Sequence, residues 1–139
     1  MAAKILEKSL DSLLKEEAVF TVLQPIVNLN KRCALGYEAL TRSHPDNLLQ
    51  NPDLLFNTAQ ACDRLTELET LCLKTAISYF SNRKSSDLLF VNICPESLIQ
   101  YSEIIDRVLG FISDYDLTPT NLVLEISERF RIENVVHLK

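Results

Sequence analysis

Two short, almost wholly apolar runs constrain the fold of this chain more than any other feature. They are LLFVNI at 88–93 and LVLEI at 122–126. Such runs are typical of parallel strands that are covered on both faces. Each run follows a stretch with helical spacing of apolar residues, and strands that alternate with helices predict a parallel sheet with helices outside it. The sequence therefore predicts an α/β fold.

The N-terminal third predicts a β-hairpin ahead of that parallel sheet. VFTVLQPIVNL at 19–29 carries β-branched residues in alternation, NLNKR at 28–32 has the polarity of a turn, and CALGYEALTR at 33–42 is the return strand. Pro25 cannot donate a ladder hydrogen bond, so the first strand lies at an edge of the sheet or ends there.

A short amphipathic helix is predicted at residues 4–17, where leucines recur at helical spacing. We favour a helix that packs on its own domain. The alternative is a signalling or dimerising segment joined to a partner domain. The predicted organisation is a lead helix at 1–18, followed by one domain at 19–139.

Three further helices are expected between and after the apolar runs. The helical pattern that opens at Pro52 and Asp53 extends to about residue 80, with room for one break. A second helix begins at 95–97 and continues to Phe111, and a last helix begins within 129–139.

Composition excludes several classes of function. The net charge of −5 argues against general electrostatic binding to nucleic acid polymers or anionic membranes, although one local Arg could still hold a phosphorylated ligand. No apolar run has the length of a membrane span, and the first residues do not resemble a signal peptide. The 4 cysteines form no C-x-x-C pair, so we expect reduced thiols rather than a zinc site.

A polar residue stands near the carboxyl end of three predicted strands. Glu38 falls late in the hairpin's return strand, Asn92 late in the next strand and Glu125 near the end of the last. Ligands of parallel sheets bind at these strand ends, and two carboxylates with an amide oxygen suit Mg²⁺, Mn²⁺ or Ca²⁺. Taken singly, each residue has a plainer explanation: a solvated carboxylate, a cap for the helix near Pro95, or an acid in the first turn of the last helix.

Three more polar residues belong to the same hypothesis. Arg42 lies about 13 Å along an extended strand from Glu38, too far to pair with it directly, but it could hold a phosphate. Gln24 could add a polar contact from the neighbouring strand. Glu128 could brace the loop after Glu125, or simply be an acid of the last helix.

Four segments, in this order, resemble the EAL domain family. The signature Glu-Ala-Leu of that family is Glu38-Ala39-Leu40, and the resemblance covers the chain from about Phe20 onward. The segments that carry it are LQPIVNL at 23–29, GYEALTR at 36–42, FVNICPESL at 90–98 and LVLEISER at 122–129.

The resemblance implies a fold and an activity. Members of the family are bacterial phosphodiesterases that cleave cyclic di-GMP to its linear dinucleotide. Their fold is a modified TIM-type barrel whose first strand runs antiparallel to the second, which agrees with the predicted hairpin. The resemblance therefore implies that this chain is a partial barrel, the N-terminal half of an EAL domain, in the cytoplasm of a bacterium.

The resemblance also assigns a metal site. It implies that Glu38, Asn92 and Glu125 bind the catalytic Mg²⁺ or Mn²⁺ ions. The family's usual Asn-x-Ser is replaced here by Asn92-Ile93-Cys94. Because a thiol is a weaker hydrogen-bond partner than a hydroxyl, Cys94 would support the metal site less well.

The remaining implied roles concern the ligand. By the resemblance, Arg42 contacts a phosphate of cyclic di-GMP, and Gln24 and Leu40 lie beside the ligand. Glu128 would support a loop at the metal site and at the dimer contact.

The later motifs of the family do not occur in these residues. A complete barrel needs about 250 residues, and the sequence contains no Asp-Asp pair. We therefore expect no complete catalytic set and no turnover by this chain alone, and we expect homo-oligomers that form through exposed sheet edges. The alternative is a non-catalytic module that binds a partner protein or a nucleotide.

Overall fold

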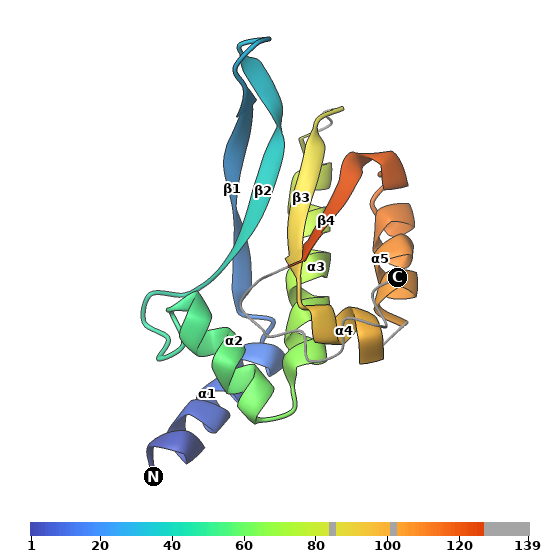
Figure 1. The fold of residues 1–139 in the computed structure, drawn as a ribbon. Helices are drawn as coiled ribbons and strands as arrows, with labels where there is room; N and C mark the ends of the chain where they lie inside the picture. Colours follow the sequence, from blue (N-terminus) through green and yellow to red (C-terminus); the bar gives the residue numbers. More distant parts are fainter. Residues whose placement is uncertain (84–85, 101–102, 127–139) are drawn as a thin grey trace.

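The computed structural model describes residues 1–83, 86–100 and 103–126 (Figure 1). Helix α1 (Ala2–Lys15) precedes the hairpin strands β1 (Val19–Asn28) and β2 (Cys33–Ser43). The remaining elements are α2 (Pro52–Ala61), α3 (Leu65–Ser81), β3 (Leu88–Ile93), α4 (Pro95–Gln100), α5 (Glu103–Asp114), a 3₁₀ turn (Pro119–Asn121) and β4 (Leu122–Ile126).

The four strands form one mixed sheet in the order β1-β2-β3-β4. β1 pairs antiparallel with β2, while β2 with β3 and β3 with β4 pair in parallel. This arrangement confirms the predicted α/β fold and its antiparallel first pair. Within the described residues β1 pairs with β2 alone, which agrees with the edge position that Pro25 predicts.

Close approach of two strands requires glycine at the start of the β2–β3 ladder. Gly36 is the register partner of Leu88, and a Cβ atom at Gly36 would lie 2.3 Å from the carbonyl oxygen of Leu88. A larger side chain would therefore push these strands apart at the point where their pairing begins.

Helices α3 and α5 cover one face of the sheet (Figure 1). Burial alternates along β3: Leu89, Val91 and Ile93 are buried, whereas the intervening residues are half-buried or exposed. The prediction of a strand covered on both faces therefore does not describe β3 as the structure shows it. The core between this face and the helices consists of Leu73, Ala76, Ile77, Phe80, Leu89, Val91, Ile93, Ile104, Val108 and Ile112.

Helix α1 packs on the domain through a second hydrophobic cluster. Leu10 and Leu13 of α1 are buried, and their cluster includes Leu55 of α2 and Leu68 of α3. The interpretation that we favoured for this segment, a helix packed on its own chain, agrees with this contact. Two ion pairs add to it, between Asp11 and Arg64 at 2.8 Å and between Glu17 and Lys74 at 3.3 Å.

The structure refines the predicted helices. The long helix from Pro52 breaks into α2 and α3 at residues 62–64, where Asp63 adopts a positive φ of 56°. The helix expected from 95 to 111 is described as α4 and α5, and the one expected within 129–139 lies outside the described residues. No helix in the described ranges combines the length and the apolarity that a membrane crossing requires.

Candidate metal and ligand site at the strand ends

The candidate residues share the face of the sheet opposite to α3 and α5. Paired residues of neighbouring strands point to the same side, and so do residues two apart on one strand. Register partners include Gln24 with Glu38, Glu38 with Phe90, and Asn92 with Glu125. One face of the sheet therefore carries Gln24, Glu38, Leu40, Arg42, Asn92 and Glu125.

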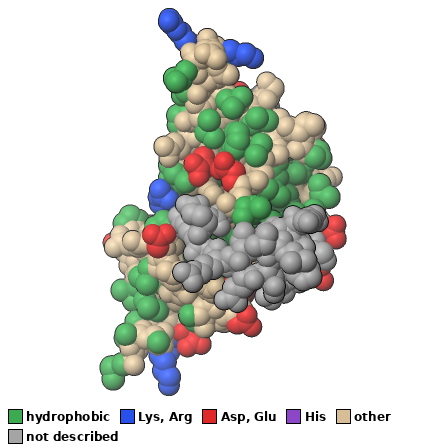
Figure 2. Space-filling model, in the orientation of Figure 1, with side chains coloured by type: hydrophobic (Ala, Val, Ile, Leu, Met, Phe, Trp, Pro, Cys, Tyr) green, Lys and Arg blue, Asp and Glu red, His purple; other side chains and the backbone are tan. Residues whose placement is uncertain are grey.

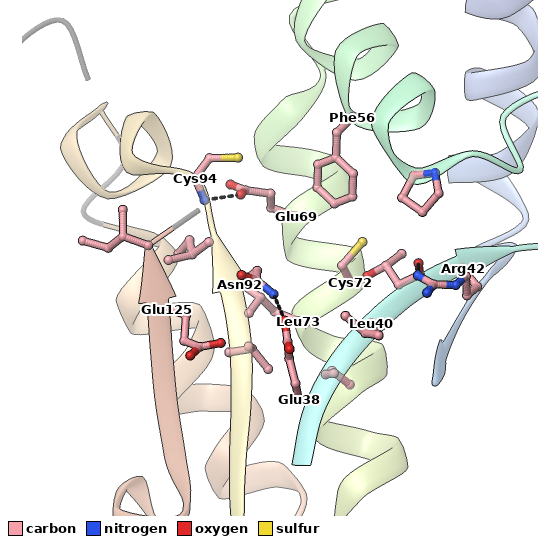
Figure 3. A pocket seen from close by; sticks show the side chains of 17 residues that line it. Glu38, Leu40, Arg42, Phe56, Glu69, Cys72, Leu73, Asn92, Cys94 and Glu125 are labelled. Carbon is pink, nitrogen blue, oxygen red and sulfur yellow. Dashed lines mark hydrogen bonds between the residues drawn. The ribbon is translucent and has the colours of Figure 1, made fainter. Parts of the chain in front are cut away.

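A pocket opens where β2 and β3 diverge. Their pairing ends at Ala39 and Val91, although β2 continues to Ser43 and β3 to Ile93. The space between the separated strands is a pocket of about 380 Å³, to which α3, behind the strands in this view, contributes side chains (Figure 3). The side chains that line it include Glu38, Leu40, Arg42, Phe56, Glu69, Cys72, Asn92, Cys94 and Glu125.

The three predicted metal ligands come together at this pocket. Nδ2 of Asn92 donates a hydrogen bond to Oε1 of Glu38 at 2.8 Å, and Glu125 stands beside Asn92 on the next strand (Figure 3). Figure 2 shows acidic side chains among hydrophobic ones on this side of the molecule. The amide nitrogen of Asn92 is thus directed at Glu38, and its oxygen Oδ1 is not used in this bond.

The ligand atoms are of the type that a hard divalent cation prefers, but they fill only part of its coordination shell. Two carboxylates and an amide oxygen are the ligands that Mg²⁺ and Mn²⁺ prefer, and such ions take about six ligands. In the described ranges, no group of three or more His, Cys, Asp and Glu side chains is placed to hold a metal ion. Water and a bound phosphate are common sources of the further ligands that such an ion takes.

The predicted ligand-binding residues lie around the pocket in different ways. Leu40 and Arg42 line it, and Nη1 of Arg42 donates to the carbonyl oxygen of Thr41 at 2.8 Å. Gln24 is exposed on β1 opposite Glu38, but it is not among the lining residues. Glu128 lies outside the described residues.

Sequence reasoning missed Glu69 of α3, a carboxylate that is only 3% exposed. Its Oε1 accepts a 2.6 Å hydrogen bond from the backbone N–H of Cys94, and its Oε2 accepts one from the hydroxyl of Ser97. Burial raises the pKa of Glu69 above its usual 4.5, although these donors oppose the shift. A signal was present, because Glu69 shares a helical face with the buried Leu65 and Leu73.

The pocket also contains two thiols. Burial raises the pKa of Cys72 to about 12, so this thiol stays protonated at neutral pH. Cys94 is buried at the end of β3. All four cysteines are free, as the sequence predicts.

The chain resembles known proteins along most of its length. The family model of the EAL domain matches residues 7–139. An uncharacterized protein of Synechocystis sp. (strain ATCC 27184 / PCC 6803 / Kazusa), sll1895, is 24% identical over 135 residues, which make up 94% of this chain and 19% of that protein.

Solved structures share the fold. The Xanthomonas citri FimX EAL domain in complex with c-diGMP aligns with a TM-score of 0.77 and 22% identity over 91% of this chain and 50% of that one. The PaMucR phosphodiesterase in complex with c-di-GMP aligns with a TM-score of 0.75 and 23% identity over 88% of this chain and 51% of that one. Klebsiella pneumoniae BlrP1 in a manganese and cyclic diGMP complex aligns with a TM-score of 0.68 and 23% identity over 80% of this chain and 28% of that one. This chain thus spans about half or less of each of these chains.

Proposed function

The chain belongs to the EAL domain family, and we propose that it forms the N-terminal part of a bacterial cytoplasmic phosphodiesterase that hydrolyses cyclic di-GMP to the linear dinucleotide. The observation that carries this proposal is the juxtaposition of Glu38, Asn92 and Glu125 on one face of three neighbouring strands, where the β2–β3 ladder ends. Complexes of FimX, PaMucR and BlrP1 with the cyclic dinucleotide support the same ligand for this chain.

We propose that these three residues hold Mg²⁺ or Mn²⁺. When bound, a divalent cation would polarise a phosphoryl oxygen and lower the pKa of a coordinated water. Glu38 and Glu125 supply the negative charge that attracts the cation. Asn92 now directs its Nδ2 toward Glu38, so its amide must turn to offer Oδ1 instead.

The ligand contacts follow from the same face. Arg42 would exchange its bond to the Thr41 carbonyl for a phosphate oxygen, for which a guanidinium is well shaped. Leu40 lines the pocket and would pack against the ligand, and Gln24 would reach it from β1. Glu128 keeps its proposed role in supporting the loop after Glu125.

We propose that the 139-residue chain binds the dinucleotide but does not turn it over by itself. Two-metal hydrolysis needs ligands for both ions and a positioned water. The Asp-Asp-Phe-Gly segment that the resemblance would assign to those tasks does not occur in this sequence.

Self-association is a further part of the proposal. In the described residues β1 pairs only with β2, and its side chains Phe20 and Val22 are 46% and 42% exposed. An exposed strand edge with apolar neighbours favours pairing with another chain. Light scattering at micromolar concentration should give at least the mass of a dimer, and a monomeric mass would contradict this part of the proposal.

The experiment that tests the proposal measures binding and cleavage together. Cyclic di-GMP is titrated into the chain by calorimetry with and without Mn²⁺, and product is sought by chromatography. We expect binding that depends on Mn²⁺ and is lost in Glu38→Ala. The control is Asp46→Ala, because the side chain of Asp46 is 92% exposed in the loop after β2.

The outcomes distinguish a chain that only binds the dinucleotide from one that also cleaves it. Binding without product supports a binding module with an incomplete site. Product that depends on Glu38 would mean that the missing ligands come from another chain. No binding by folded protein with or without Mn²⁺ would contradict the proposed ligand.

A further inference from the structure

Glu69 occupies a position between the candidate site and the helix that follows it. The residue lies on α3, between the buried Leu68 and Leu71, and its carboxylate is 3% exposed. Burying a carboxylate costs free energy unless donors satisfy it, and an apolar side chain would fill such a place more cheaply. The contacts of its two oxygens therefore have to account for this carboxylate at a buried position.

The two oxygens hold opposite sides of one junction. Oε1 accepts a hydrogen bond from the backbone N–H of Cys94, the residue directly after β3 (Figure 3). Oε2 accepts one from the hydroxyl of Ser97 in the first turn of α4. Cys94 lies two residues beyond Asn92. The carboxylate thus ties the end of the strand that carries Asn92 to the start of α4.

This junction lacks support from β2. The β2–β3 ladder ends at Ala39 and Val91, one residue before Asn92. On its other side Asn92 still pairs with Glu125 of β4. Glu69 therefore contributes hydrogen bonds to the end of β3 from the side of the sheet where the ladder has ended.

We propose that Glu69 is a positioning residue: by clamping Cys94 and Ser97 it fixes the end of β3, so that the Asn92 side chain stays against Glu38. The claim that Asn92 then meets a cation rests on the proposed function, but the clamp itself does not. Residues that orient metal ligands in this way commonly change metal affinity by about 10- to 100-fold when removed.

Two readouts test the clamp in the full 139-residue chain. The first is the NMR signal pair of the Asn92 side-chain amide, which reports its bond to Glu38 without any metal. The second is Mn²⁺ affinity, measured by water proton relaxation. The variants are Glu69→Ala, which removes both acceptors, and Glu69→Gln, which keeps the length and one acceptor oxygen. The control is Glu103→Gln on α5, whose side chain is 78% exposed and lies 3.8 Å from Arg107.

The clamp predicts a specific pattern. In Glu69→Ala the two side-chain amide signals of Asn92 should move to the chemical shifts of a solvent-exposed asparagine, and Mn²⁺ affinity should fall at least about 10-fold. Glu69→Gln should keep the Asn92 signals near their wild-type shifts and Mn²⁺ affinity within a few-fold of wild type, and Glu103→Gln should change neither. In an Asn92→Ala background, Glu69→Ala should cause no further loss of Mn²⁺ affinity. A merely structural role would lower stability equally in both backgrounds without moving the Asn92 signals.

The contrary results are equally definite. A folded Glu69→Ala protein with unchanged Asn92 signals overturns the clamp. If Glu69→Ala does not fold, Ser97→Ala removes one of the two donors and must shift the Asn92 signals in the same direction, or the clamp is wrong. If the wild type binds no Mn²⁺ while Glu69→Ala still releases the Asn92 amide, the clamp stands and the proposed cation fails.

Discussion

Nδ2 of Asn92 donates to Oε1 of Glu38 at 2.8 Å, and this bond joins β3 to β2 at the end of their ladder, with Asn92 one residue past the last pair and Glu38 one residue before it. A side-chain bond thus continues the contact between two strands after their ladder has ended. It also places an N–H donor against a carboxylate at the point where we propose that a cation binds.

Replacement of this donor by a carboxylate should make folding depend on a cation. In Asn92→Asp two like charges would face each other, so the free energy of unfolding should fall by about 1–4 kcal/mol without metal. Mn²⁺ at 100 times its Kd should restore about 2.7 kcal/mol. Urea unfolding with and without Mn²⁺ measures both effects. The control is Asn57→Asp on the exposed side of α2, and an equal response of the two variants to Mn²⁺ would argue against the site.

The buried carboxyl of Glu69 should give stability a pH dependence of known sign. Because burial raises its pKa above 4.5 in the folded chain, the unfolded chain releases this proton at lower pH than the folded one. The free energy of unfolding contributed by Glu69 is therefore fully present below pH 4.5 and falls as pH rises through the folded pKa. Glu69→Gln should remove this fall in urea unfolding measured from pH 4 to pH 8.

A matched carboxyl two residues away should behave oppositely. The hydrogen bond from Arg64 lowers the pKa of Glu67 below 4.5, so its contribution is present above pH 4.5 and is lost as pH falls through the folded pKa. Since the side chain of Glu67 is 53% exposed, the effect should be small. If Glu69→Gln and Glu67→Gln change the pH dependence in the same direction, the assignment for Glu69 fails.

The two glycines of the chain should respond oppositely to alanine. At Gly36 the added Cβ would meet the Leu88 carbonyl, so Gly36→Ala should cost about 1–3 kcal/mol. At Gly110, within α5, an added Cβ would meet nothing within 4 Å, so Gly110→Ala should stabilise by about 0.5–1 kcal/mol. Thermal unfolding of both variants checks the contrast, and a stable Gly36→Ala would mean that β2 and β3 can separate without cost.

Truncation of α1 side chains should show whether this helix unfolds with the sheet. Leu10 is fully buried in the cluster with α2 and α3, so Leu10→Ala should cost about 2–5 kcal/mol. Ile5 is 50% exposed on the same helix, and Ile5→Ala should change stability by less than about 0.5 kcal/mol. Both variants should unfold in a single transition followed by circular dichroism. A separate early transition in Leu10→Ala would show that α1 is an independent unit.

Much of the fold could be predicted because its signals are local. The apolar runs predicted the bounds of β3 and β4, and the turn residues predicted the hairpin. The break between α2 and α3 was harder to locate, because it depends on Asp63, a residue other than glycine in the left-handed region of φ. The alternation of burial along β3 could not be seen in the sequence, since the half-buried Leu88 and Phe90 are as apolar as the buried Leu89 and Val91.

The site was predictable only where it lies on strands. Asn92 and Glu125 are the next-to-last residues of β3 and β4, and the carboxyl ends of parallel strands meet by topology. The expectation that Glu38 falls late in its strand was wrong, because β2 continues to Ser43 and it is the β2–β3 ladder that ends near Glu38. Glu69 was missed because acids are usually exposed, as Glu67 on the same helix is, and the apolar helical face that Glu69 shares with Leu65 and Leu73 was not weighed. The pocket itself could not be predicted, because it depends on where the β2–β3 ladder stops.

Asn92 and Glu125 are register partners, so insertions and deletions in their strands keep the two side chains on one face only when an even number of residues is added or removed. Since successive side chains of a strand alternate between faces, one residue inserted into β3 just before Asn92 would turn its amide toward the helices. Two inserted residues would return the amide to the pocket side, one pleat further along. The 3₁₀ turn before β4 carries no alternation of side chains between two faces, so this constraint does not apply there. Length variation in descendants of this sequence should therefore gather in that turn and in the loops, and should enter the strands only in pairs.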